Sequence, residues 1–338
     1  MNASDFSQCA RQHDACPFCP EGELSSFLPD QSFVYDDEGS SWTFNYAINR
    51  CSSCGVGLMN PMPESQLSNC FYSTSYNCYI KPLELVEQLK TQPMKFSSAR
   101  WVAGNALLHK LLAGLVALLI GRRFTYTLSR PMVMDTSARF LDFGCGAGTF
   151  LLLLKALGYK NLFAWDISSN LEVSTALEQA GITQLPVEFT NNSLMDGEFD
   201  MIRMEHVLEH SNDPLELLKK LKSKLADGGE IVCTVPDFDS WCIKLDPKSC
   251  PLLHLPYHTW HFTSKSLAIL CREAGLEIVK ERKIPVYRQY QQSLEKTDGH
   301  QFLKRLTCLV GKLGQPFYAI VSDIKGNGDF LSLTLRKV

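Results

Sequence analysis

The sequence lacks a run of twenty apolar residues, an internal repeat and any low-complexity segment. It also lacks a basic stretch followed by an apolar one at its start, so we expect no secretory signal and a cytoplasmic protein. The net charge of −3 provides no bulk attraction for nucleic acid. What remains is a chain of 338 residues, 45% hydrophobic and 20% charged, which predicts a globular protein of two or more domains.

The 13 cysteines are odd in number, and many lie in apolar runs. A disulfide framework needs paired cysteines in an oxidising compartment, so this pattern instead favours a reducing one.

The most informative stretch is residues 140–150. A short apolar run ends in Asp142, and three glycines follow at every second position, Gly144, Gly146 and Gly148. A helix is predicted over 150–157. A strand, a glycine turn and a helix start present backbone amides to a bound nucleotide. The spacing differs from the dinucleotide fingerprint, and a carboxylate before the turn would repel a pyrophosphate but suit an amino-acid ammonium group.

This stretch resembles motif I of the class I S-adenosylmethionine-dependent methyltransferases. From residue 138 onward, strand and helix patterns alternate, which predicts an α/β, Rossmann-like doubly wound sheet over 138–338. The predicted strands are 140–142, 162–166, 187–189, 199–204, 231–235 and 330–336, the last antiparallel. The predicted helices are 150–157, 171–180, 214–225 and 266–273, with a turn at 227–230.

The resemblance implies S-adenosylmethionine as cofactor. Asp166, at the end of the second strand, would accept both ribose hydroxyls, although a lone Asp there can also be a helix cap. Ile167 would cover the adenine, and Asn192 would read its amino group. The full set of candidate cofactor residues is Asp142, Phe143, Gly144, Cys145, Gly146, Gly148, Asp166, Ile167, Asn192 and Glu205.

The segment after the fourth strand contains His206, Glu209 and His210. Its His-x-x-Glu-His spacing also fits an inverted zinc-peptidase pattern, but that pattern requires a helix, and here it follows a sheet strand. The segment resembles instead the His-x-Leu-Glu-His of methyltransferases that act on ubiquinone-type acceptors and polysaccharide sugars. His206 then either faces the substrate or is structural, and we expect structural roles for Glu209 and His210.

A polar and aromatic cluster at 254–263 contains Tyr257, His258 and His261. We expect it on a loop over the sheet edge, where one histidine could act as general base. Metal binding by His258 and His261 is an alternative for which the sequence shows no nearby carboxylate. Thr263 or Ser264 is expected to cap the following helix.

Residues 1–80 form a separate predicted module. Cys16 and Cys19, and then Cys51 and Cys54, make two Cys-x-x-Cys pairs, which can supply four thiolates to a structural zinc in a ribbon-like module. The alternatives are four ordinary cysteines or a redox pair. This module carries roughly two basic and nine acidic residues, opposite to a nucleic-acid-binding zinc ribbon.

Residues 81–137 are predicted to be a basic helical connector. Its apolar helix over 106–120 ends at Gly121 and is followed by Arg122 and Arg123. This helix either packs on the core, lies at a membrane surface through 106–123 with the two arginines toward anionic lipid, or spans the membrane.

These expectations combine into one enzyme, a methyltransferase. No Asn-Pro-Pro-Tyr or Asp-Pro-Pro-Tyr follows the fourth strand, so the acceptor is expected to be oxygen or carbon rather than a planar nitrogen. A sugar or lipid-linked glycan precursor is the favoured acceptor, and peripheral membrane contact would suit it. The alternatives are an RNA methyltransferase with a zinc ribbon and a non-catalytic methyltransferase-like binding protein.

Overall fold

The computed structural model describes residues 10–37, 40–64, 135–167, 171–191, 195–286, 318, 321–322 and 324–338. The apolar helix predicted over 106–120, the basic residues that follow it to 123, and Asn192, which is predicted to read the adenine, lie outside these residues. Within the described part of the chain, no helix is long and apolar enough to cross a membrane.

The chain divides into two compact units. The first contains Met1–Tyr76, Glu205–Lys222 and Val232–Val338, and the second contains Asn77–Met204 and Ser223–Ile231.

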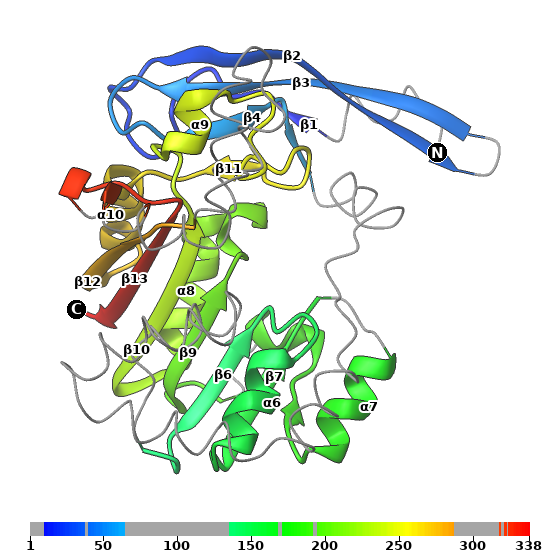
Figure 1. Cartoon of the computed structure of the whole chain (residues 1–338), viewed down its shortest axis with the longest axis vertical. Coiled ribbons are helices and arrows are strands. Elements are labelled where there is room, and N and C mark those ends of the chain that lie inside the picture. The colour runs from blue at the N-terminus through cyan, green and yellow to red at the C-terminus, as the bar shows by residue number, and fades with distance from the viewer. Residues whose placement is uncertain are drawn as a thin grey trace. The chain divides into compact units, whose positions relative to one another are not determined.

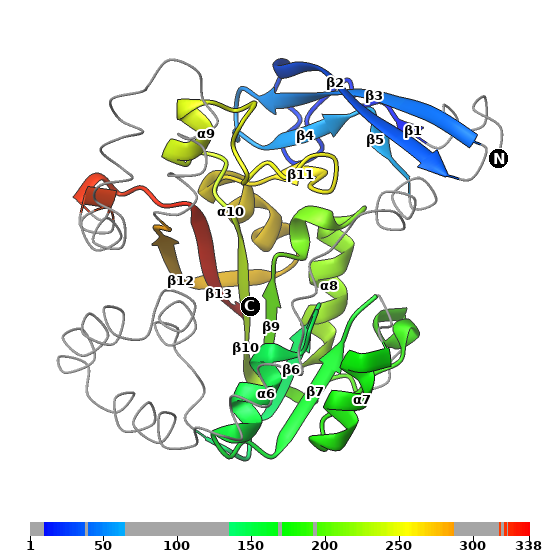
Figure 2. The same cartoon turned by 45° about the vertical axis from the view of Figure 1, so that its right-hand side comes forward.

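The second unit carries the strand–turn–helix predicted from the glycine motif. Strands β6 (Arg139–Phe143), β7 (Asn161–Trp165) and β8 (Thr183–Gln184) pair in parallel, and β9 (Phe199–Glu205) pairs in parallel with the other side of β6. Helices α6 (Thr149–Ala156) and α7 (Leu171–Gln179) connect the strands, and both lie beside β6 and β7 in the two views (Figures 1 and 2). Four consecutive leucines of α6, residues 151–154, are buried, so this helix is anchored in the core.

The complete sheet has seven strands in the order β12-β13-β10-β9-β6-β7-β8. Strand β10 (Leu225–Pro236) follows α8 (Pro214–Lys224), and the antiparallel pair β12 (Leu276–Ile284) and β13 (Phe330–Lys337) ends the sheet. The predicted doubly wound sheet and its late antiparallel strand are therefore confirmed.

Two local predictions are wrong. The strand predicted at 187–189 is a 3-10 helix, η2 (Val187–Asn191), because the amide of Phe189 donates to the carbonyl of Pro186 at 3.0 Å and closes a tight turn. The turn predicted at 227–230 lies within β10. Its second glycine is required by close packing, since a Cβ at Gly229 would come within 2.6 Å of the Phe199 carbonyl.

The first unit contains a four-stranded antiparallel sheet of order β11-β4-β3-β2. Strands β2 (Leu24–Asp37), β3 (Ser40–Cys51) and β4 (Gly57–Asn60) come from the N-terminal residues, and β2 and β3 form a long ribbon (Figure 1). The fourth strand, β11 (Trp260–His261), comes from the polar and aromatic cluster. A short ladder of β1 (Ala10–Arg11) and β5 (Met62–Pro63) lies in the same unit.

The first unit also contains the helices η3 (Leu208–His210), α9 (Trp241–Leu245) and α10 (Ser264–Glu273). Thr263 caps α10 as predicted, through a capping box with Ser266. Its hydroxyl also donates to the carbonyl of Cys54 at 2.8 Å, which joins the cap to the second cysteine pair.

Candidate functional site

The glycine turn after β6 adopts the backbone conformation that its sequence predicts. Gly144, Gly146 and Gly148 all have positive φ, at 78°, 52° and 67°. At Gly148 a side chain is also excluded by packing, since a Cβ would lie 2.7 Å from Leu177 of α7. The turn begins where the amides of Gly144 and Cys145 donate to the carbonyl of Trp165 at 2.8 and 3.0 Å.

Asp166 holds the middle of this turn. Its Oδ2 accepts a hydrogen bond from the amide of Gly146 at 2.8 Å, so the residue predicted to bind ribose also shapes the loop that would receive the cofactor. Phe143 stacks on Trp165, the residue before Asp166, with ring centroids 4.1 Å apart. Ile167, the residue after Asp166, is 72% exposed. The predicted contacts of Asp166 with ribose and of Ile167 with adenine remain predictions.

Asp142 is completely buried and is paired with an arginine. Its Oδ1 lies 2.7 Å from Arg203 Nη1, and the Arg203 side chain is 14% exposed. The guanidinium also lies 4.1 Å from the ring centroid of Phe150 in α6. Burial, with the charges of Asp142 and Asp166 nearby, raises the pKa of the Cys145 thiol, so this cysteine stays protonated. The predicted contact of Asp142 with the cofactor remains a prediction.

His206 follows directly on the last residue of β9, Glu205. It has a φ of 55°, which is rare outside glycine, and its amide donates to the carbonyl of Thr234 at 2.9 Å. Its side chain is 37% exposed, and its Nδ1 lies 3.1 Å from Oε1 of the buried Glu209. The ring edge packs against Phe330 at 4.9 Å. An exposed imidazole is thus held by a buried carboxylate.

Glu209 is also the carboxylate that the sequence did not show near His258. His258 Nε2 lies 3.8 Å from Glu209 Oε1, and the ring of His210 lies 4.7 Å from that of His258. Burial lowers the pKa of His210, and burial together with neighbouring histidines lowers that of His258 well below its usual value. Tyr257 is half-buried and contributes its carbonyl, which lies 2.9 Å from Nδ1 of His210.

His261 is set apart from these groups. It is 4% exposed in strand β11, stacks on Phe238 with centroids 5.2 Å apart, and burial lowers its pKa to about 3. Its Nε2 has no hydrogen-bond partner among the described residues. Of the four residues predicted to be catalytic, His206 is therefore the most exposed imidazole with a carboxylate partner, while His258 and His261 are buried.

The two cysteine pairs converge as predicted. The Sγ atoms of Cys16 and Cys54 are 3.6 Å apart, those of Cys16 and Cys19 are 3.5 Å apart, and those of Cys19 and Cys51 are 3.3 Å apart. Sulfurs around a tetrahedral zinc are separated by roughly 3.8 Å, from a Zn–S bond of about 2.3 Å. This four-cysteine cluster therefore fits zinc in its donor set and its size. A hydrogen bond from the Cys54 thiol lowers the pKa of Cys16 to about 5, which makes one sulfur a ready thiolate.

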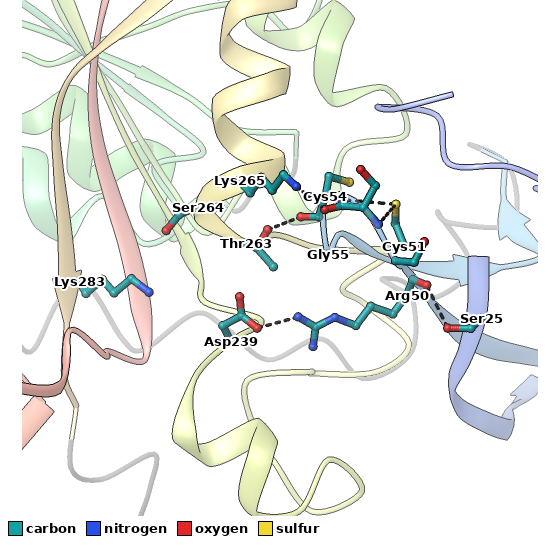
Figure 3. Close-up of a pocket in the computed structure, with 12 residues that line it drawn as sticks. Ser25, Arg50, Cys51, Cys54, Gly55, Asp239, Thr263, Ser264, Lys265 and Lys283 are labelled. Atoms are coloured by element: carbon teal, nitrogen blue, oxygen red, sulfur yellow. Dashed lines mark hydrogen bonds and ion pairs between the residues drawn. The ribbon is translucent and has the colours of Figure 1, made fainter. Parts of the chain in front are cut away.

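A pocket of about 490 Å³ lies beside the four-cysteine cluster and has three cationic side chains in its wall (Figure 3). Arg50 pairs with Asp239 at 2.6 Å, and the Nζ of Lys265 donates to the carbonyl of Ser53 at 2.6 Å. Lys283 lies 3.1 Å from the buried Asp237, whose pKa is raised by burial. Each cation already has a hydrogen-bond or ion-pair partner in the protein. We therefore interpret these groups as structural contacts that connect the cysteine pairs with the segments around α10.

Two of these relationships were not accessible from the sequence. Arg203 carries no motif signal, and it reaches Asp142 only because β6 and β9 are neighbours. Glu209 was expected to be structural, yet it joins His206 to His258. The signal that could have found it is the His-x-x-Glu-His spacing itself, since residues three apart share one face of a helical turn.

Comparisons with known proteins agree with this geometry. Residues 115–281 match the family model described as a methyltransferase domain. The chain is 29% identical over 210 residues to a ubiquinone biosynthesis O-methyltransferase of Cereibacter sphaeroides, which covers 56% of this chain and 80% of the relative. It is 28% identical over 143 residues to a tRNA U34 carboxymethyltransferase of Campylobacter hominis, covering 39% and 46%.

A solved S-adenosylmethionine-dependent methyltransferase from Archaeoglobus fulgidus is similar at 20% identity and a TM-score of 0.43, covering 66% of this chain and 98% of that one. The glycine turn and the parallel sheet agree with the match to the methyltransferase family model. The chain belongs to the class I S-adenosylmethionine-dependent methyltransferases.

Proposed function

We propose that this methyltransferase acts on a hydroxyl oxygen or an acidic carbon of a small molecule, with a sugar or lipid-linked glycan precursor as the favoured acceptor. The observation that carries the proposal is the pair formed by His206 and Glu209. The carboxylate holds the imidazole through Nδ1, which leaves Nε2 to accept a hydrogen bond from an acceptor hydroxyl.

The position of His206 in the chain supports this role. Met204 is paired in register with Phe143 at the end of β6, immediately before the glycine turn, and His206 follows two residues later. In parallel sheets ligands bind beyond the carboxyl ends of the strands. The φ of His206 is 55°, an uncommon backbone conformation outside glycine that often accompanies functional sites.

In the proposed reaction an acceptor oxygen attacks the sulfonium methyl carbon, the carbon–sulfur bond breaks, and S-adenosylhomocysteine leaves. The acceptor proton passes to Nε2 of His206. The buried Glu209 fixes the orientation of the ring and stabilises its charged form, as a carboxylate does for a catalytic histidine.

The acceptor class is supported by the similarity to an O-methyltransferase and by the residues that follow β9. The relative from Cereibacter sphaeroides is named for O-methylation, and the segment after β9 lacks the proline-tyrosine motif of planar nitrogen acceptors. A second candidate, methylation of RNA, draws only on the tRNA enzyme from Campylobacter hominis, and the acidic N-terminal residues disfavour it.

Radiolabelled methyl transfer from S-adenosylmethionine tests the proposal. The purified full chain is incubated with nucleotide sugars, a polyprenyl-linked sugar, a catechol and bulk tRNA, and the product is analysed for the methylated atom. His206→Gln should reduce kcat at least about 100-fold while leaving S-adenosylhomocysteine affinity unchanged. His254→Gln, an exposed histidine of the neighbouring loop, is the matched control and should retain activity.

Methylation of tRNA alone, or full activity of the His206→Gln variant, would refute the proposal.

We also propose that the four-cysteine cluster binds one structural zinc, since four thiolates leave no coordination position open for a substrate.

A further inference from the structure

A second group of metal-binding side chains lies in the first unit, apart from the four-cysteine cluster. Glu209 and His210 come from η3, and His258 comes from the loop before β11. One ligand atom from each residue lies within 4.8 Å of the other two. The three residues are held together by the backbone as well, since the amide of Thr259 donates to the carbonyl of Glu209 at 3.0 Å.

Both histidines are oriented as metal ligands are. Nδ1 of His210 lies 2.9 Å from the carbonyl of Tyr257, and Nδ1 of His258 lies 3.0 Å from the carbonyl of Leu252. A carbonyl can only accept, so each Nδ1 carries the proton, and in a neutral ring the Nε2 atom then carries a lone pair. A backbone carbonyl that fixes one ring nitrogen while the other faces a metal is the usual outer arrangement of zinc-bound histidine.

Glu209 supplies the negative charge. Its side chain is 1% exposed, and its Oε2 has no hydrogen-bond partner among the described residues. Its Oε1 lies 3.1 Å from His206 and 3.8 Å from Nε2 of His258. The Nε2 lone pair of His258 thus lies beside the Glu209 carboxylate, and a cation held by the carboxylate and the imidazole together would remove the repulsion between these two acceptors. Leaving a carboxylate oxygen bare in a buried site is also costly.

We propose that Glu209, His210 and His258 bind a divalent transition metal, with zinc as the expected ion. Two imidazole nitrogens and one carboxylate oxygen form a donor set that zinc favours, and three protein ligands leave a position open for water or an acceptor oxygen. Ligand atoms around a tetrahedral zinc lie roughly 3.3 Å apart, so atoms that are up to 4.8 Å apart would approach by about 1.5 Å at most when the ion binds.

This inference goes beyond the proposed function and does not depend on the acceptor. Oε1 of Glu209 stays with His206 while Oε2 turns to the ion, so both roles of the carboxylate are compatible. The ion would act on an acceptor oxygen by withdrawing electron density, which lowers the affinity of that oxygen for its proton.

Metal content and metal-dependent stability of the full chain test the proposal. Protein is stripped with a chelator, reloaded with zinc, freed of loosely bound ion and measured by mass spectrometry. The unaltered chain should hold two zinc ions. His258→Gln and Glu209→Gln should each hold one, because the four-cysteine cluster is intact. His254→Gln, whose ring is 5.1 Å from that of His258 but which is not among the three ligands, should hold two.

Thermal unfolding separates loss of metal from loss of fold. With chelator present, Glu209→Gln should be at least as stable as the unaltered chain, because the bare buried charge has been removed. With zinc in excess, the unaltered chain should gain roughly 5 °C or more over Glu209→Gln. One zinc in the unaltered chain after saturation, or two in His258→Gln, would overturn the proposal. Equal zinc-dependent shifts in the unaltered chain and Glu209→Gln would also overturn it.

Discussion

The buried pair of Asp142 and Arg203 gives the sharpest quantitative prediction. Arg203→Met keeps the length and apolar stem of the side chain and removes its charge, leaving a carboxylate that is 1% exposed without its cation at 2.7 Å. Breaking a buried pair in this way costs about 3 to 5 kcal/mol, whereas an exposed pair contributes about 0 to 1 kcal/mol. The contact of the guanidinium with Phe150 adds a further part of the loss.

Urea unfolding of the full chain measures this loss, and a double-mutant cycle isolates the pair. We expect Arg203→Met to lower the free energy of unfolding by about 3 kcal/mol or more at pH 7. In an Asp142→Asn background the same substitution should cost much less, because no buried charge is stranded. Arg272→Met is the matched control, since Arg272 pairs with Glu273 on the surface and both side chains are more than half exposed.

The pH dependence of the variant provides an independent check. A buried carboxyl without its cation is more stable when protonated, so the folded variant takes up a proton more readily than the unfolded chain. Its stability should therefore be higher at pH 5 than at pH 7 relative to the unaltered chain. A loss below about 1 kcal/mol at pH 7, or no coupling in the cycle, would refute the account of Asp142 as a charge that depends on Arg203.

Further predictions concern the turn, the cysteines and a buried histidine. Asp166→Ala should abolish S-adenosylmethionine binding in calorimetric titration, and unchanged affinity would contradict its ribose role. Gly148→Ala should lower stability by about 1 to 3 kcal/mol in urea unfolding, because φ is 67° and the new Cβ would meet Leu177, and a neutral result would contradict this. A mercurial reagent that titrates the four-cysteine cluster should release one zinc and lower Tm, whereas thiols that react without zinc release would show a metal-free cluster. Burial lowers the pKa of His261 to about 3, against a usual 6.5 in the unfolded chain. The unfolded chain therefore takes up a proton at this histidine first as the pH falls below 6.5, and the free energy of unfolding should decrease by about 2 kcal/mol at pH 5. His261→Phe should remove that part of the acid sensitivity, and an unchanged pH–Tm profile would contradict the assignment.

The parts of the fold that depend on local pattern were predictable. The apolar strand before the glycine turn, the leucines of α6 and the Thr263 cap each follow from a few adjacent residues. The two local errors arose where backbone contacts overrode the pattern, at the tight turn after Pro186 and at Gly229 of β10, which packs against the carbonyl of Phe199 in β9.

The parts that depend on pairing between distant segments were not predictable. Nothing in one sequence indicates that β11 adds to the N-terminal sheet, since a two-residue strand has no period to detect. The same holds for Glu209 and His258, which lie about fifty positions apart and meet only because their loops are hydrogen-bonded together.

The pairing of β11 with β4 has a consequence for how the protein is made. Trp260 pairs with Leu58, and the amide of Met59 donates to the carbonyl of Thr259, so the outer edge of β4 stays bare until the ribosome has added about 200 further residues. An unpaired strand edge invites association with other chains. The nascent N-terminal sheet therefore cannot be completed during early synthesis, and a fragment ending near residue 80 would expose this edge permanently. The N-terminal residues, expressed separately or exchanged between related enzymes, should not fold correctly unless the segment around residue 260 is included with them.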